Sequence, residues 1–200
     1  MIDALRTGLI DRVTQSRVLE ALRVHGAEAG ELTLIPVADR LARFINFVPE
    51  ALSTLTRLGK EGGYGRAIAF GTSQVLLYVM DEQDLLPDSA HDPIGILDDA
   101  YLVHKYLTGV YHSYPAARAR VNESLLAEVS TIEFVAHLLP DGVAAALDRT
   151  CESLLTVGSA LFSTAETPKA DVREPLFERL RFENALKSQQ PGTEKSQAKG

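Results

Sequence analysis

The chain has 200 residues, enough for one domain with a sizeable core, and its 46% apolar and 24% charged residues are typical of globular proteins. Its 27 acidic and 20 basic residues give a formal charge of −7. This balance argues against nonspecific nucleic-acid binding, because phosphate-binding surfaces need clustered Lys and Arg. The single cysteine, Cys151, excludes an internal disulfide and favours a reducing cytoplasm.

The N-terminal half predicts two long helical segments. Apolar residues recur at spacings of three and four over residues 2–24 and again over residues 32–58. Pro49 lies inside the second pattern and is expected to kink or divide that helix after Val48, because proline lacks an amide donor and clashes with the preceding turn. Glycines at 59, 62, 63 and 65 then predict a break.

Residues 64–82 predict a third helix that is apolar nearly all round between Ala67 and Met80. Such a helix is typical of the middle of a bundle. A buried strand is the alternative for a short apolar run, but the length and the low β-branched content favour a helix. A membrane-spanning helix needs about 20 apolar residues, so no transmembrane segment is expected here. The first residues also lack the pattern of a signal peptide.

The second half predicts further helices. One covers residues 97–112, and another begins at Pro115 and continues along an apolar stripe to Leu139. The run Pro140-Asp141-Gly142 ends that helix and begins the next, which stops before Pro168. A last amphipathic helix is expected over 172–187, followed by a disordered polar tail at 188–200. The prediction is an all-α bundle of six or seven helices, forming a single domain over 1–187.

Acidic residues concentrate between Asp81 and Asp99, a window that covers the connection between the third and fourth helices and the first residues of the fourth. Seven carboxylates and no Lys or Arg fall within this window: Asp81, Glu82, Asp84, Asp88, Asp92, Asp98 and Asp99. The window therefore contains the whole charge excess of the chain, and the remainder balances at 20 acids against 20 bases. We call residues 81–96 the acidic turn. Its charge predicts a local negative potential suited to a basic partner.

The residues around the acidic turn carry a resemblance. The pattern combines Tyr78, Asp84-Leu85-Leu86-Pro87-Asp88 and Gly95 with Leu97-Asp98-Asp99. It resembles the YkvA-like family of bacterial domains of unknown function, over about residues 64–107. The resemblance implies a helical hairpin within the larger helical domain, and it implies no established activity.

The acidic turn admits two interpretations. Asp84, Asp88, Asp98 and Asp99 could converge on Mg²⁺ or Mn²⁺, hard ions that prefer carboxylate oxygens, with His91 as an additional ligand. The favoured alternative is that Asp88 and Asp98 cap helix ends while the other carboxylates face water. The turn lacks the glycine-centred loop of an EF-hand, and no three or four ligands have the spacing of a zinc site.

Other candidate residues favour structural roles. Gly63, Gly65 and Arg66 precede a helix and could hold an anion, although a hinge is the commoner use of such a run. His104 and His112 are expected to face solvent or to be hydrogen-bonded packing residues, and Cys151 is expected to be a buried thiol rather than a nucleophile.

Three hypotheses for function follow from these patterns. The leading one is a non-catalytic cytoplasmic protein that acts through contacts with a protein partner or a second copy of itself, using the acidic turn as its surface. The second is a metal-dependent enzyme, such as a hydrolase, that holds Mg²⁺ or Mn²⁺ on the same carboxylates. The third is contact with a membrane surface through the last amphipathic helix, which ranks lowest because its bases are offset by Glu174, Glu178 and Glu183.

Overall fold

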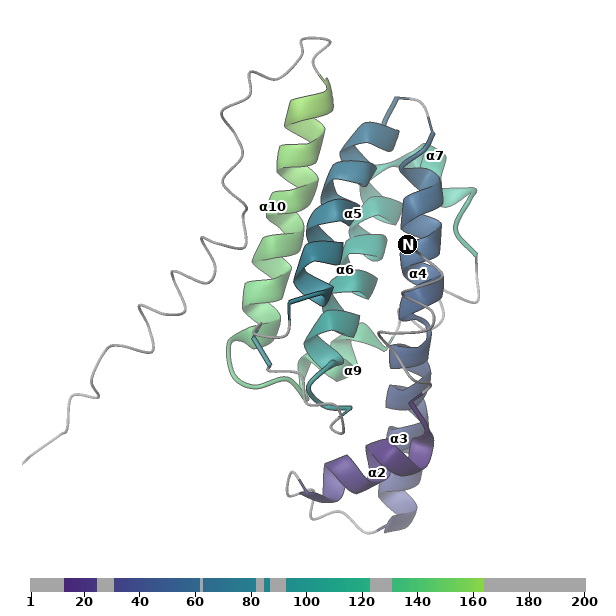
Figure 1. Ribbon diagram of the computed structural model, residues 1–200, viewed down its shortest axis with the longest axis vertical. Helices are drawn as coiled ribbons and strands as arrows, with labels where there is room; N and C mark the ends of the chain where they lie inside the picture. The colour runs from purple at the N-terminus through teal and green to yellow at the C-terminus, as the bar shows by residue number, and fades with distance from the viewer. Residues whose placement is uncertain are drawn as a thin grey trace, which may run out of the picture. The chain divides into compact units, whose positions relative to one another are not determined.

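A computed structural model describes residues 13–24, 31–61, 63–81, 85–86, 93–122 and 131–163. Every regular element within these ranges is a helix, which confirms the predicted all-α bundle (Figure 1). The chain divides into two compact units, residues 1–168 and 169–200, and all described residues belong to the first. The predicted helix at 172–187 and the predicted tail therefore lie outside the described residues. The helices are α2 (Gln15–Val24), α3 (Glu31–Asn46), α4 (Val48–Leu58), α5 (Gly65–Val79), α6 (Leu97–Ser113), α7 (Pro115–Arg118), α9 (Ile132–Ala136) and α10 (Val143–Ser163).

Helices α2 and α3 pack mainly against one another. Val18, Ala21 and Leu22 are the buried residues of α2. Asn46, at the end of α3, holds the chain that leads into α2, because its amide donates to the Val13 carbonyl (2.8 Å) and accepts from the Val13 amide (3.0 Å). These contacts make α2 and α3 a helical hairpin, which we call the α2–α3 hairpin.

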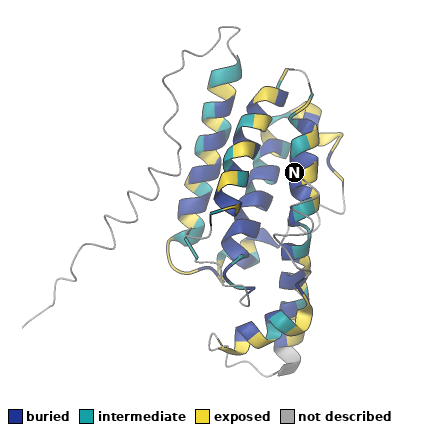
Figure 2. Cartoon of the chain, viewed as in Figure 1, coloured by how far each residue is buried: buried dark blue, intermediate teal, exposed yellow. Residues whose placement is uncertain are grey.

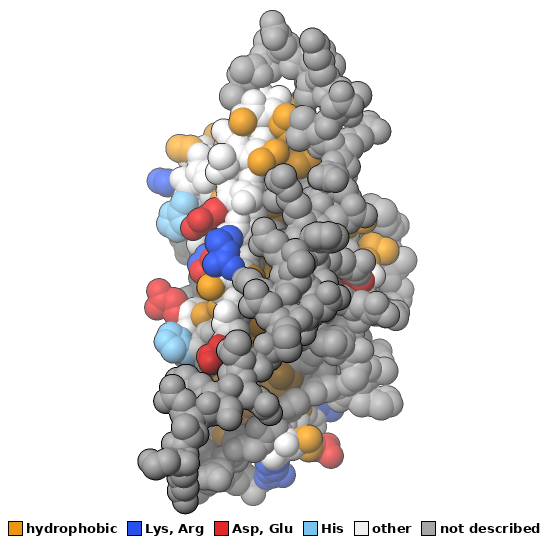
Figure 3. All heavy atoms as spheres, turned by 90° about the vertical axis from the view of Figure 1, so that its left-hand side faces the viewer, with side chains coloured by type: hydrophobic (Ala, Val, Ile, Leu, Met, Phe, Trp, Pro, Cys, Tyr) orange, Lys and Arg blue, Asp and Glu red, His pale blue; other side chains and the backbone are white. Residues whose placement is uncertain are grey.

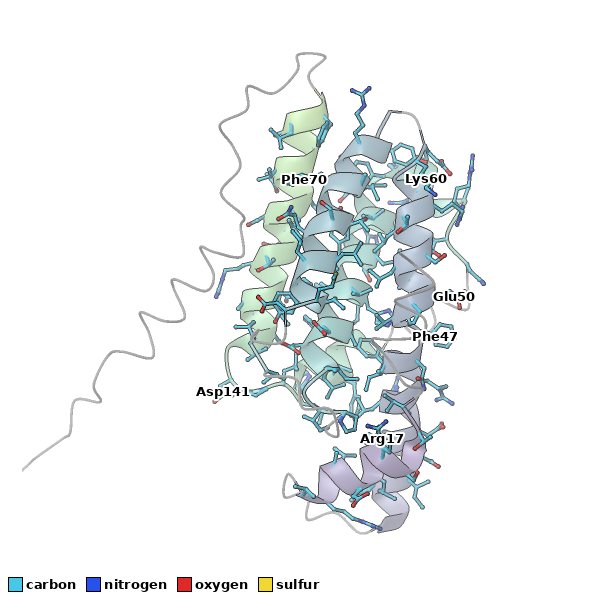
Figure 4. All side chains as sticks on the ribbon, viewed as in Figure 1. Arg17, Phe47, Glu50, Lys60, Phe70 and Asp141 are labelled. Carbon is cyan, nitrogen blue, oxygen red and sulfur yellow. The ribbon has the colours of Figure 1, made fainter. Side chains whose placement is uncertain are left out.

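Helix α3 ends at Asn46 and α4 begins at Val48, so the predicted division is present, but it falls before Val48 rather than after it. Pro49 occupies the first turn of α4, where its missing amide donor costs least. Phe47 keeps a helical conformation between the two helices, and its amide still donates to the Arg43 carbonyl at 3.0 Å. Figure 4 labels Phe47 at this position, which we call the α3–α4 joint.

Helices α5, α6 and α10 form the centre of the bundle, with α4 beside α5 and α6 (Figure 1). Glycines allow this close packing. A Cβ atom at Gly71 of α5 would lie 2.0 Å from the hydroxyl of Tyr106 on α6. A Cβ atom at Gly158 of α10 would lie 3.1 Å from the Ala67 carbonyl of α5. A side chain at position 71 would therefore require Tyr106 to move, and one at position 158 would require a smaller adjustment of α5.

The most deeply placed helix is α6 rather than α5. Eleven residues of α6 are buried, whereas α5 leaves a stripe exposed that contains Arg66, Ala69, Ser73, Leu77 and Met80. The prediction that residues 67–80 occupy the middle of the bundle is correct for one side of α5 only. Polar contacts also fasten α6 to α10, since Asp148 accepts a hydrogen bond from Tyr101 (2.8 Å) and pairs with Lys105 (2.9 Å).

The boundaries of the central helices agree with the sequence prediction within a few residues. Gly142 has a φ of +83°, which explains why the turn before α10 falls there. The predicted continuous helix from Pro115 to Leu139 is wrong. Helix α7 ends at Arg118 and turns follow, although residues 123–130 lie outside the described ranges. No described helix combines the length and the hydropathy that crossing a bilayer requires.

Candidate functional site

The acidic turn leaves the end of α5 and leads into the start of α6. Its described residues are Asp81, Leu85, Leu86 and 93–96. Asp84, Asp88 and His91 lie outside the described residues, so their proposed part in a metal site stays a prediction. The remaining two candidates, Asp98 and Asp99, occupy the first turn of α6.

Asp98 accepts hydrogen bonds from three separate parts of the chain. Its Oδ2 atom accepts from the Tyr78 hydroxyl of α5 (2.7 Å) and from the Leu86 amide of the acidic turn (3.2 Å). Its Oδ1 atom accepts from the Asp99 amide in the first turn of α6 at 3.0 Å. The Tyr78 hydroxyl in turn accepts from the Leu85 amide at 3.4 Å. Asp98 therefore joins the end of α5, the acidic turn and the start of α6.

The carboxyl of Asp98 is fully buried. Burial raises the pKa of this carboxyl to about 6, because a charge is disfavoured away from water, while the hydrogen bonds from Tyr78, Asp99 and Leu86 act in the opposite direction. Three donors point at the group, as an ionised carboxylate requires. The hydrogen bonds of Asp98 thus favour the charged form and its burial favours the neutral form.

Asp99 is buried as well, with 5% of its surface exposed. Neither Asp98 nor Asp99 can therefore supply surface charge, which corrects the expectation that the whole acidic window contributes to an exposed potential. The N-cap position of α6 is Ile96 and has no side-chain cap, so Asp98 does not cap the helix as expected but accepts from the Asp99 amide within the first turn. Within the ranges that the structure describes, no group of three or more His, Cys, Asp or Glu side chains could hold a metal ion.

Of the proposed anion-binding residues, Gly63 lies in the turn between α4 and α5, and Gly65 and Arg66 begin α5. Gly63 is exposed with a φ of +68°, a conformation that favours glycine. Gly65 is buried, and a Cβ atom there would lie 3.1 Å from the Gly59 carbonyl. Both glycines therefore have a structural reason to be glycine. Arg66 is exposed beside them, and its binding of an anion stays a prediction.

The end of α5 exposes two large apolar side chains. Leu77 is 56% exposed and Met80 is 62% exposed, and they flank the buried Tyr78 and Val79. Their spacing of three residues places them on one side of the helix, where Figure 2 shows exposed segments of α5 in yellow. We call Leu77 and Met80 the α5 apolar pair. On the face drawn in Figure 3, the described side chains mix charged and apolar types without a dominant kind.

Sequence reasoning missed two buried polar contacts of α6. One is the hydrogen bond between Tyr78 and Asp98, which are 20 positions apart. The other involves His104, whose Nε2 atom lies 2.9 Å from the Phe44 carbonyl at the end of α3. His104 is fully buried, which confirms the packing alternative predicted for it. A signal was present, because His104 shares the spacing of the apolar residues Ala100 and Leu107.

Comparison with known proteins adds no relative: no protein-family model, curated protein or solved structure matches this chain.

Proposed function

We propose that this protein is a non-catalytic helical module that binds a partner helix at the end of α5, and that the partner segment carries both apolar and basic side chains. The observation that carries the proposal is the exposure of Leu77 and Met80 on the last turns of α5. Methionine suits such a surface, because its unbranched, polarisable side chain adapts to partners of different shape.

Charge complementarity supports a basic partner. Asp81 directly follows the α5 apolar pair, and Glu82, Asp84, Asp88 and Asp92 follow within twelve residues of Met80 along the chain. No Lys or Arg lies in this stretch. Asp98 and Asp99 are buried, so the proposal depends on the acids that precede them along the chain. An amphipathic helix with Lys and Arg beside its apolar face would satisfy both features.

The hydrogen bonds of Asp98 support the same interpretation, because they give the end of α5 a defined backbone. Tyr78 lies between Leu77 and Met80, and its hydroxyl is held by Asp98 and the Leu85 amide. A surface that is ordered before binding loses less conformational entropy when the partner docks. A YkvA-like identity for residues 64–107 is part of the proposal and would extend this role to other chains with the same Tyr-Asp pattern.

Site-specific photo-crosslinking in cells tests the proposal. A photo-reactive residue replaces Met80, and the same residue at Val24 of α2, which is 78% exposed, serves as the matched control. We expect position 80 to crosslink to a segment with apolar and Lys or Arg residues at helical spacing, and position 24 not to do so. Reversal of Asp84 and Asp88 to Lys should reduce this crosslink by about tenfold, since each lost charge contact contributes up to about 1 kcal/mol.

Two results would contradict the proposal. One is the same set of crosslinks from positions 24 and 80. The other is a crosslinked segment without basic residues whose yield is unchanged by the two reversals. Asp98 and Asp99 are left intact in this experiment because reversing a buried carboxylate would test folding rather than binding.

A further inference from the structure

Another buried titratable group of α6 is His104, which contacts the last turn of α3. Its ring lies 4.3 Å from the ring of Phe44, and its Nε2 atom lies 2.9 Å from the Phe44 carbonyl. Because a carbonyl can only accept, Nε2 carries the proton and donates it. The Nδ1 atom is then an unprotonated acceptor, and it is buried without a hydrogen-bond partner. The hydrogen bond to Phe44 forms in either protonation state, and it is the buried Nδ1 without an acceptor that favours the neutral imidazole.

Protonation of Nδ1 would add a donor and a positive charge where no acceptor receives them. Burial accordingly lowers the pKa of His104 to about 4, although the hydrogen bond to Phe44 acts in the opposite direction. In the open chain the imidazole binds a proton near pH 6.5. Any opening that exposes His104 thus becomes easier as the pH falls between these two values.

The described charged side chains on the elements packed around α6 do not pair with the His104 imidazole. Arg43 pairs with Asp39 at 2.7 Å, and Arg40 donates to Thr131 at 3.2 Å. None of the charged or titratable side chains in the described ranges forms a hydrogen bond or ion pair with the imidazole. On α6 and the elements packed around it these are Asp39, Arg40 and Arg43 of α3, Glu50 and Arg57 of α4, Arg66 and Tyr78 of α5, Asp98, Asp99, Tyr101, Lys105, Tyr106, Tyr111 and His112 of α6, Arg118 of α7, Glu133 of α9, and Asp148, Arg149, Cys151 and Glu152 of α10.

Because His104 contacts α3, we expect its protonation to affect the attachment of α3 rather than the whole bundle. The α2–α3 hairpin packs mainly on itself, whereas α5, α6 and α10 pack extensively on one another. From α3 toward later parts of the chain, Phe44 contacts His104, and Arg40 contacts Thr131 and lies 5.5 Å from the centroid of the Phe134 ring. Loss of the His104 contact therefore weakens the attachment of α3 more than it weakens the central helices.

We infer that His104 is a proton-sensitive contact that holds the α3–α4 joint against α6 while neutral, and that its protonation releases the α2–α3 hairpin before the α5–α6–α10 core opens. The contact between His104 and Phe44 responds to a fall in pH and requires no ligand. It is independent of the partner proposed above, because it lies at the α3–α4 joint and not at the end of α5.

Hydrogen exchange between pH 7 and pH 4.5, corrected for the intrinsic exchange rate, tests this inference. We expect protection of amides in residues 37–47 to fall about tenfold per pH unit below pH 6.5, while amides of α10 keep their protection. In His104→Gln the amide group can still donate to the Phe44 carbonyl but cannot titrate, so this fall should disappear. His112→Gln, an exposed histidine of the same helix, is the matched control and should behave like the unaltered chain.

Two outcomes would overturn the inference. One is an equal pH dependence in His104→Gln and in the unaltered chain. The other is a loss of protection in α3 and α10 together, which would indicate global opening. If His104→Gln does not fold, proton NMR of the unaltered chain decides: a His104 midpoint near pH 4 with concurrent shifts of α3 amides supports the inference, and a midpoint near 6.5 in the folded protein refutes it.

Discussion

Two joints of this bundle are each held by one buried titratable side chain of α6. One side chain accepts hydrogen bonds and the other donates one. At the junction of α5 and α6, Asp98 accepts hydrogen bonds from Tyr78, Leu86 and Asp99. At the α3–α4 joint, His104 donates one hydrogen bond to the Phe44 carbonyl. Burial raises the pKa of Asp98 and lowers that of His104. The comparison shows that burial favours the neutral form of both groups, and so gives them opposite pH dependences.

The largest changes are expected in the contributions of Asp98 and His104 to the free energy of unfolding, which depend on pH in opposite directions. The folded pKa of Asp98 exceeds its unfolded value, so its contribution to the free energy of unfolding is full below about pH 4 and is lost as the pH rises through 6. The folded pKa of His104 is below its unfolded value, so its contribution is full above about pH 6.5 and is lost as the pH falls through 4. Each change amounts to about 3 kcal/mol, and in the unaltered chain the two nearly cancel.

Urea unfolding of Asp98→Asn and His104→Gln across pH 4–7 measures both contributions. The free energy of unfolding of the unaltered chain, minus that of Asp98→Asn, should fall by about 3 kcal/mol between pH 4 and 6. The corresponding difference for His104→Gln should rise by a similar amount between pH 4 and 6.5. Differences that change in the same direction for both variants would show that the two joints do not oppose one another.

A smaller effect is expected when the acceptor at the α5–α6 junction is removed. In Asp98→Ala the Tyr78 hydroxyl and two amides lose their acceptor, which destabilises the protein, while relief of the buried charge offsets part of this loss. We expect a net destabilisation of about 2 kcal/mol at pH 7 by urea unfolding. Asp141→Ala, at an exposed acid before α10 that Figure 4 labels, should change the stability by less than about 0.5 kcal/mol. Equal losses of stability in Asp98→Ala and Asp141→Ala would show that the hydrogen bonds of Asp98 do not stabilise the α5–α6 junction.

The smallest loss of stability is expected when one donor to Asp98 is removed and the Asp98 carboxyl is left in place. Tyr78→Phe deletes the hydroxyl that donates to Asp98 and accepts from Leu85. We expect a loss of about 1 kcal/mol and, by NMR, a rise in the pKa of Asp98, because the hydrogen bond from Tyr78 lowers that pKa. An unchanged Asp98 titration would mean that the hydroxyl does not contribute to holding the charge.

Local chemistry made much of the fold predictable. Pro49 lacks an amide donor, so a division of the helix near it could be predicted from the sequence, although Pro36 lies inside α3 without ending it. The turn at Gly142 and the start of α6 at Leu97 are likewise set by neighbouring residues. The continuous helix predicted from Pro115 to Leu139 failed for a related reason. An apolar stripe indicates which side of a helix would be buried, but it does not require the helix to continue through residues 119–122.

The burial of particular acids could not be predicted in the same way. Seven carboxylates lie in one window, and nothing in their spacing distinguishes Asp98 from Asp84. The distinction arises because packing of α5 on α6 brings the Tyr78 hydroxyl within 2.7 Å of Asp98. His104 was easier, because its apolar spacing marks a buried position, although its partner on α3 is 60 residues away. Pairings over such separations depend on the fold as a whole.

The contact of Gly71 with Tyr106 has an evolutionary consequence. The Tyr106 hydroxyl occupies the volume that even a methyl group at position 71 would need, and it also donates to the Ile68 carbonyl at 3.3 Å. A larger residue can enter at 71 only after the ring at 106 has been shortened, and a shortened residue at 106 leaves a gap beside 71. A substitution at position 71 is therefore expected to be tolerated better together with a smaller residue at position 106.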